Sequence, residues 1–151
     1  MKKTAAIIVT AAMLICAIAA GNTRVVAHVH AGDLIEIEGG WTTRLTGIRV
    51  PPPNDPVGWQ AYEFTKRRLE GQTVAMFTWT TDNTAATIFR DQDGRPFATI
   101  MFGKDLATDI AVLLLENGLA RVDREHLPEH CQHYLEIERK ARELGLGTWA
   151  G

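Results

Sequence analysis

The amino-acid sequence predicts an α+β domain built on a small β-barrel. Three observations predict it: short segments that alternate apolar with polar residues, one segment of helical period inserted among them, and two further helical segments at the end. Short strands with a helix inserted after the third are typical of an OB-fold. We see no internal repeat, linker or low-complexity segment, so we expect a single domain.

The beginning of the chain has the pattern of an export signal. Two lysines precede an apolar run over residues 5–20, and residues 17–19 form a small-residue cleavage pattern. The run is shorter than the roughly 20 apolar residues of a membrane-spanning helix. We therefore predict a signal peptide over 1–20, a domain over 21–151, and a secreted, periplasmic or cell-envelope location. Once cleaved, the domain is expected to have no stable membrane insertion, and an uncleaved N-terminal anchor is the alternative.

The composition argues against a strongly basic nucleic-acid binder and against stabilisation by a disulfide. The chain has 16 basic and 18 acidic residues, and without the two lysines of the signal its net charge is about −4. A strongly electrostatic nucleic-acid binder usually has a basic face, so this balance argues against one and leaves only a local basic patch open. Cys131 is the one cysteine beyond the signal, so no intramolecular disulfide is expected.

Strand signals come first along the domain. Residues 25–30 and 34–38 alternate, and the turn residues 32–33 between them predict a hairpin. Residues 43–50 predict a third strand. It ends at the three prolines of 51–53, because proline lacks the backbone donor that a strand ladder needs.

The period changes after the prolines. Residues 57–71 have a helical period that ends in a glycine. Alternation returns over 73–80, and a second hairpin is predicted from 86–90 and 97–102, around an Asp-x-x-Gly-Arg turn at 91–95. The expected number of strands is five or six.

Two helices are expected at the end of the domain. Residues 105–116 have apolar side chains at helical spacing, and Asn117-Gly118 follows as a C-cap. Pro128 opens a last helix that runs to about Leu144. Trp149 is predicted to fill the core.

Four local signatures occur in order: Gly32-Asp33 after a strand, Arg44-Leu45-Thr46-Gly47-Ile48 ending in Pro51, Asp91-x-x-Gly94-Arg95, and Asn117-Gly118-Leu119-Ala120. Together they resemble the staphylococcal nuclease (thermonuclease) family, over nearly all of residues 25–149. The resemblance implies a five-stranded OB-fold β-barrel with three helices. For intact members it also implies calcium-dependent cleavage of phosphodiester bonds in DNA and RNA.

The resemblance further implies a set of site residues. Asp33 matches the first calcium carboxylate of the family, and Arg44 and Arg95 match its two phosphate-binding arginines. Arg49 stands where the family has its second calcium carboxylate. Pro52 stands where the family has the glutamate that orients or deprotonates the attacking water.

Both replacements act against catalysis. Calcium prefers six to eight oxygen ligands, several of them anionic, whereas Arg49 is cationic. A unit positive charge about 5 Å from a divalent ion costs on the order of 6 kcal/mol at an effective dielectric of about 20. Pro52 has no proton acceptor, and general-base assistance contributes roughly 10²- to 10⁴-fold. We expect an incomplete metal site at Asp33 and no cofactor. If another carboxylate replaces the missing ligand, calcium is the expected cofactor. Candidate replacements are Glu36, Glu38 and Asp55.

The surroundings of this site also differ from the family. Asp93, Arg124 and His126 stand where members carry base-stacking tyrosines. Stacking provides much of the affinity for single strands, so binding of the nuclease type is weakened. Nucleic acid or another anionic ligand is the expected partner class, and the sequence identifies no protein partner.

The arginines and tryptophans also have structural interpretations. Arg44 would pair with Asp33 in the absence of calcium, and Arg95 would cap its own turn. Most aromatic residues of a small domain pack in or near its core. The tryptophans that would otherwise line a groove are Trp41, Trp59 and Trp79.

Histidines give a further alternative, a transition-metal site. His28 and His30 point to one face of a strand and would need Asp33 as a third ligand. A second cluster consists of His126, His130, Cys131 and His133. Its two helical histidines share a face and would suit zinc, although solvated histidines without metal are commoner.

The leading interpretation is an exported staphylococcal-nuclease-like domain that lacks calcium-dependent nuclease activity and acts as a binding or interaction module. The alternative is a secreted or envelope nuclease with a rearranged site, in which Asp33, Arg44 and Arg95 are retained.

Overall fold

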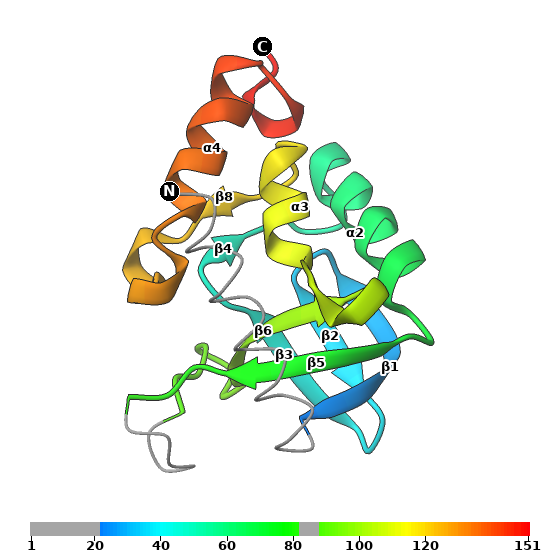
Figure 1. Cartoon of the computed structure of the whole chain (residues 1–151). Coiled ribbons are helices and arrows are strands. Elements are labelled where there is room, and N and C mark those ends of the chain that lie inside the picture. Colours follow the sequence, from blue (N-terminus) through cyan, green and yellow to red (C-terminus); the bar gives the residue numbers. More distant parts are fainter. Residues whose placement is uncertain (1–21, 82–87) are drawn as a thin grey trace.

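The computed structural model describes residues 22–81 and 88–151 (Figure 1). In this part of the chain a barrel is formed by β1 (Thr23–Ala31), β2 (Leu34–Ile37), β3 (Trp41–Leu45), β5 (Thr73–Thr78) and β6 (Phe97–Phe102). Neighbours in the order β3-β2-β1-β5-β6 are antiparallel, and a parallel pairing of β3 with β6 closes the circle. On one side of the barrel lie α2 (Pro56–Leu69), α3 (Ile110–Glu116) and α4 (Tyr134–Glu143). The predicted five-stranded OB-fold with three helices is confirmed.

The predicted first hairpin is confirmed, and its turn is held against α2. Gly32 lies so close to this helix that a Cβ atom on it would be 2.7 Å from the Cβ of Ala61. The Thr65 hydroxyl on α2 donates a hydrogen bond of 2.8 Å to the Gly32 carbonyl. These contacts fix the position of the next residue, Asp33.

The predicted strand over 43–50 is two strands with a turn between them. β3 ends at Leu45, and β4 (Ile48–Arg49) pairs outside the barrel with β8 (Arg121–Val122). Gly47 has a φ of 75°, a left-handed conformation that glycine adopts at little cost. The turn therefore takes Arg49 out of the barrel ladder.

Only residues 88–90 of the first strand predicted for the second hairpin lie in the described part of the chain. Residues 82–87 lie outside the described part of the chain, and Ile88 and Arg90 form only isolated bridges. The backbone of Phe89 donates to the carbonyl of Trp79 and accepts from the amide of Phe97. Residues 88–90 therefore bridge the ends of β5 and β6.

The predicted helix over 105–116 begins later, at Ile110. Before it come the 3-10 turn η2 (Lys104–Leu106) and the strand β7 (Thr108–Asp109), which pairs with β6. Asp105 has a φ of 57°, which is incompatible with a right-handed helix. Asp109 then caps α3, because its Oδ1 accepts a hydrogen bond of 2.9 Å from the Ala111 amide.

The last helix begins later than the predicted Pro128. The 3-10 turns η3 (Arg124–His126) and η4 (Glu129–Cys131) precede α4. The predicted core position of Trp149, in the final turn η5 (Gly147–Trp149), is wrong: the side chain is half-buried. Guanidinium carbons of Arg121 and Arg142 lie 4.3 and 4.6 Å from its ring centre. The reason is the position of the chain end, which lies beyond α4 and away from the barrel (Figure 1).

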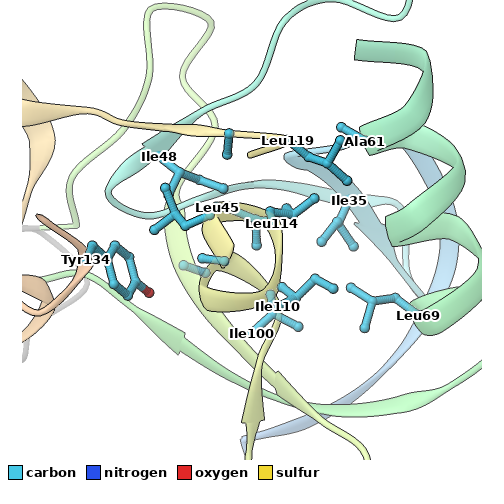
Figure 2. Close-up of a cluster of buried hydrophobic side chains, with 14 of the residues drawn as sticks. Ile35, Leu45, Ile48, Ala61, Leu69, Ile100, Ile110, Leu114, Leu119 and Tyr134 are labelled. Atoms are coloured by element: carbon cyan, nitrogen blue, oxygen red, sulfur yellow. The ribbon is translucent and has the colours of Figure 1, made fainter. Parts of the chain in front are cut away.

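The hydrophobic core lies between the barrel and the helices (Figure 2). Its fully buried side chains include Ile35, Leu45, Ile48, Leu69, Ile100, Ile110, Leu114 and Tyr134. The Tyr134 hydroxyl donates a hydrogen bond of 2.5 Å to Asp109 Oδ2. Burial raises the pKa of Asp109, although this hydrogen bond opposes the rise. The core thus joins α3, α4 and the barrel in one packed unit.

Within 22–81 and 88–151, no helix has the length and apolar character needed to cross a bilayer. The predicted signal over 1–20 lies outside these ranges and stays a prediction.

Candidate functional site

Asp33 and Arg44 form the centre of the candidate site. Asp33 is the second residue of the β1–β2 turn, and its side chain is only 6% exposed. Arg44 Nη1, on β3, donates a hydrogen bond of 3.0 Å to Asp33 Oδ2. Burial raises the pKa of Asp33, while the charge and hydrogen bond of Arg44 oppose the rise. The carboxylate is therefore already engaged by a cation of the chain.

Asp91 links Arg44 to the turn that precedes β6. Asp91 Oδ2 accepts a hydrogen bond of 2.9 Å from Arg44 Nε and lies 3.4 Å from Arg95 Nη1. Its Oδ1 accepts from the backbone amides of Asp93 and Arg95, both at 2.9 Å. Burial acts to raise the pKa of Asp91, but these hydrogen bonds outweigh it and the pKa is lowered. Asp91 was not predicted as a site residue, although its position at the start of an Asp-x-x-Gly turn is a local signal for such a role.

Arg95 completes a chain of ion pairs. Its Nη1 donates a hydrogen bond of 2.7 Å to Asp93 Oδ2 in addition to its contact with Asp91. We call the alternating series Asp33, Arg44, Asp91, Arg95 and Asp93 the ion-pair network. The structure thus brings the three predicted site residues together. Because the network joins two guanidinium groups to three carboxylates, it offers an incoming anion no net positive charge.

Arg49 makes its ion pairs with a different segment. Its Nη2 lies 3.1 Å from Asp123 Oδ1 and 2.9 Å from Glu125 Oε2, and its side chain is 60% exposed. Burial acts to raise the pKa of Asp123, but hydrogen bonds from Arg49 and His126 outweigh it and the pKa is lowered. Arg49, which stands where the family has a calcium-binding carboxylate, is therefore already paired with Asp123 and Glu125.

The family described as "Staphylococcal nuclease homologue" matches residues 42–151. The chain belongs to the staphylococcal nuclease family. It is 31% identical over 100 residues to "Staphylococcal nuclease domain-containing protein 1" of Drosophila melanogaster. That alignment covers 64% of this chain and 10% of the fly protein, so the chain spans about a tenth of that relative.

Membership of the nuclease family confirms the resemblance seen in the sequence. The match begins at Thr42, so it includes both predicted phosphate-binding arginines and begins after Asp33. Asp33 is placed in the site by its ion pair with Arg44. The catalytic roles that the resemblance implies for these side chains stay predictions.

The residues present do not fit the calcium that the nuclease family implies. Asp33 is the one carboxylate of the expected cage, and a guanidinium nitrogen lies 3.0 Å from it. Arg49 is cationic, and the Pro52 carbonyl accepts a hydrogen bond of 2.9 Å from the Asp55 amide. Calcium prefers six to eight oxygens, several of them anionic. A single carboxylate that is already paired with a cation does not meet this requirement.

The carboxylates considered as replacements have other positions. Glu36 Oε2 lies 2.7 Å from His30 Nε2. Asp55 is the N-cap of α2, and its Oδ1 accepts a hydrogen bond of 2.8 Å from the Val57 amide. Glu38 lines a groove at the other end of β2. Two of the three therefore already pair or cap, and the third faces a different surface.

The positions that replace base-stacking tyrosines have polar contacts. Asp93 belongs to the ion-pair network. Arg124 Nη2 donates a hydrogen bond of 2.7 Å to Glu138 Oε2. The His126 ring stacks on Phe97, with ring centres 5.3 Å apart. These positions therefore supply one imidazole and no larger aromatic surface for a base.

The first histidine alternative lacks its third ligand. The rings of His28 and His30 lie 6.4 Å apart between centres, on exposed side chains. Asp33 does not join them, because its carboxylate is buried against Arg44.

In the second histidine cluster, His126 lies near the carboxylates Asp123 and Glu125. Burial raises the pKa of Cys131 to about 12, so at neutral pH this side chain is a buried thiol. Across the described ranges, the group of three potential ligands that lies within metal-binding distance is Asp123, Glu125 and His126. Arg49 already pairs with both of its carboxylates.

Proposed function

We propose that this domain does not cleave phosphodiester bonds with calcium and acts as a binding or interaction module. The ion pair of 3.0 Å between Arg44 and Asp33 carries the proposal, because it engages the one family carboxylate that is present. Arg49 and Pro52 replace the second metal ligand and the base. The joint loss of metal and base supports a non-catalytic role more strongly than either loss alone.

The energetics of the site also support the proposal. A divalent ion that takes Asp33 Oδ2 would displace the Arg44 guanidinium from it, and breaking a buried pair costs about 3–5 kcal/mol. Arg44 Nε is held on its other side by Asp91 at 2.9 Å. A metal ion would gain little in return, since calcium sites use several carboxylates.

A nuclease assay tests the loss of activity. The purified protein is incubated with single-stranded DNA and millimolar calcium, beside Asp33→Ala and the surface control Glu116→Ala. We expect cleavage at the background rate for all three. Robust cleavage that Asp33→Ala abolishes and Glu116→Ala preserves would overturn the proposal.

One observation favours a second candidate, a nuclease with a rearranged site. Arg44 and Arg95, which match the phosphate-binding pair of the family, both contact Asp91 and so lie together. Calorimetric titration with calcium separates the candidates. The nuclease requires a heat of binding that Asp33→Ala removes, whereas the non-catalytic module gives no such heat.

As the ligand of the module we propose nucleic acid or another polyanion. Membership of the nuclease family supports this class. The ion-pair network and a net charge of about −4 oppose tight binding, so we expect weak binding that decreases as salt is added. Fluorescence anisotropy of labelled single-stranded DNA at low and high salt measures both properties. Absence of binding at low salt would contradict this ligand class.

We also propose that the domain is exported. The lysines, apolar run and small-residue pattern of residues 1–20 support this. Mass spectrometry of the protein recovered from cytosolic, envelope and external fractions of its native cells gives both location and N-terminus. An uncut chain in the cytosolic fraction would contradict export, and an uncut chain in the envelope would indicate the anchor.

A further inference from the structure

A groove lies at the end of the first hairpin opposite the ion-pair network. β2 and β3 pair from Leu34 opposite Arg44 at one end to Ile37 opposite Trp41 at the other. At about 3.3 Å per residue, these ends are about 10 Å apart. The groove has a volume of about 510 Å³, within the range of roughly 300–1,000 Å³ typical of ligand sites. It is therefore a separate site of suitable size.

Trp41 lines this groove and leaves 66% of its surface exposed. Trp59 and Trp79 have ring partners, at 5.2 and 3.9 Å between centres, whereas Trp41 has none among the described residues. Met76 and Phe77 add half-buried apolar surface. An uncovered indole beside apolar side chains provides a platform for a flat ligand.

The polar side chains of the groove are balanced in charge. They comprise Arg24, Glu38, Asn22 and Thr78. Hydroxyl groups of a ligand can accept from a guanidinium and donate to a carboxylate, so such a lining suits a neutral, polyhydroxylated ligand. For a polyanion, the attraction of Arg24 is offset by the repulsion of Glu38, and the net negative charge of the domain adds to the repulsion. The charges therefore favour a sugar over a nucleic acid at this site.

We propose that the groove binds a neutral oligosaccharide, with one sugar ring stacked on Trp41. β-Linked sugars with equatorial hydroxyls present a flat face of C–H bonds to the indole, and their hydroxyls point sideways toward the polar lining. OB barrels are able to bind oligosaccharides as well as oligonucleotides. This site is separate from the ion-pair network, which lies at the other end of the hairpin.

Calorimetric titration of the purified protein with chitohexaose and cellohexaose tests the proposal. We expect saturable binding with a millimolar or lower Kd to at least one of them. Trp41→Ala weakens it by about tenfold or more, because the stacking surface is lost, and Trp41→Phe gives an intermediate loss. The control Trp59→Ala removes a tryptophan that is 52% exposed outside the groove and leaves the affinity within about twofold.

Three results would overturn the proposal. One is no binding of either sugar at millimolar concentration. Another is sugar binding that Trp41→Ala leaves unchanged while its melting temperature matches the unmodified protein. The third is binding of oligothymidylate that Trp41→Ala removes, since this assigns the groove to nucleic acid.

Discussion

Replacing Arg44 by methionine would measure the strength of the ion-pair network. Methionine is similar in length to the aliphatic part of arginine but lacks the guanidinium, so the buried Asp33 loses the cation that pairs with it. Unit charges about 4 Å apart attract by about 4 kcal/mol at an effective dielectric of about 20. Removal of one partner from a buried pair costs about 3–5 kcal/mol. We expect Arg44→Met to lower the free energy of unfolding by about 3–4 kcal/mol at neutral pH, which is a large share of the roughly 5–15 kcal/mol of a typical domain.

The size of this loss depends on pH. Burial raises the pKa of Asp33 above its ordinary value of 3.8, and removal of Arg44 raises it further. Folded Asp33 then holds its proton more tightly than unfolded Asp33, so stability falls as pH rises through the folded pKa. The lowered pKa of Asp91 gives stability above its unfolded pKa, and part of this is lost with Arg44. Both effects make Arg44→Met more costly at neutral than at acid pH.

Urea unfolding followed by tryptophan fluorescence, at about pH 4.5 and about pH 7.5, measures this difference. The control Arg67→Met removes a guanidinium whose side chain is 76% exposed and whose partner Glu63 is 34% exposed, and we expect a loss below about 1 kcal/mol. The double variant Asp33→Asn with Arg44→Met should recover part of the stability, because no unpaired charge is left. A loss below about 1 kcal/mol for Arg44→Met at both pH values would refute the inference that this pair keeps a metal ion from Asp33.

Three further variants test packing and hydrogen bonds that stabilise the fold. Gly32→Ala places a Cβ 2.7 Å from that of Ala61 and should cost about 2 kcal/mol in urea unfolding; an unchanged midpoint would contradict this. Glu138→Ala leaves a buried β8 amide without its acceptor and should cost about 2–4 kcal/mol by thermal unfolding. Tyr134→Phe raises the pKa of Asp109 further, so its melting temperature should fall increasingly below the unmodified protein as pH rises; a constant difference would contradict this.

Local patterns predicted most of the fold, and they failed where the backbone turns without a change of pattern. The strand over 43–50 was predicted too long because Gly47, with its φ of 75°, lies inside an apolar segment. The helix over 105–116 was predicted too long because apolar spacing does not reveal the φ of 57° at Asp105. Both errors concern single residues whose positive φ leaves no mark on the apolar spacing of the segment.

The candidate site was predictable only in part. The short motifs around Asp33, Arg44 and Arg95 placed these residues in one site, and the structure shows them in one network. The bridging role of Asp91 depends on the pairing of β3 with β6, which no local pattern reveals. The ion pairs of Arg49 were equally hidden, because one of its two partners, Glu125, lies 76 residues further along the chain.

The parallel pairing of β3 with β6 also governs how the protein folds during synthesis. Arg44 lies opposite Phe97 in that ladder, so the ribosome must release both segments before the barrel can close. Loop closure over such a separation costs entropy, and folding dominated by distant contacts is slow. Until then the growing chain exposes an open strand edge, a template for aggregation. We therefore expect this nascent chain to depend on chaperones for longer than a helical bundle of equal length.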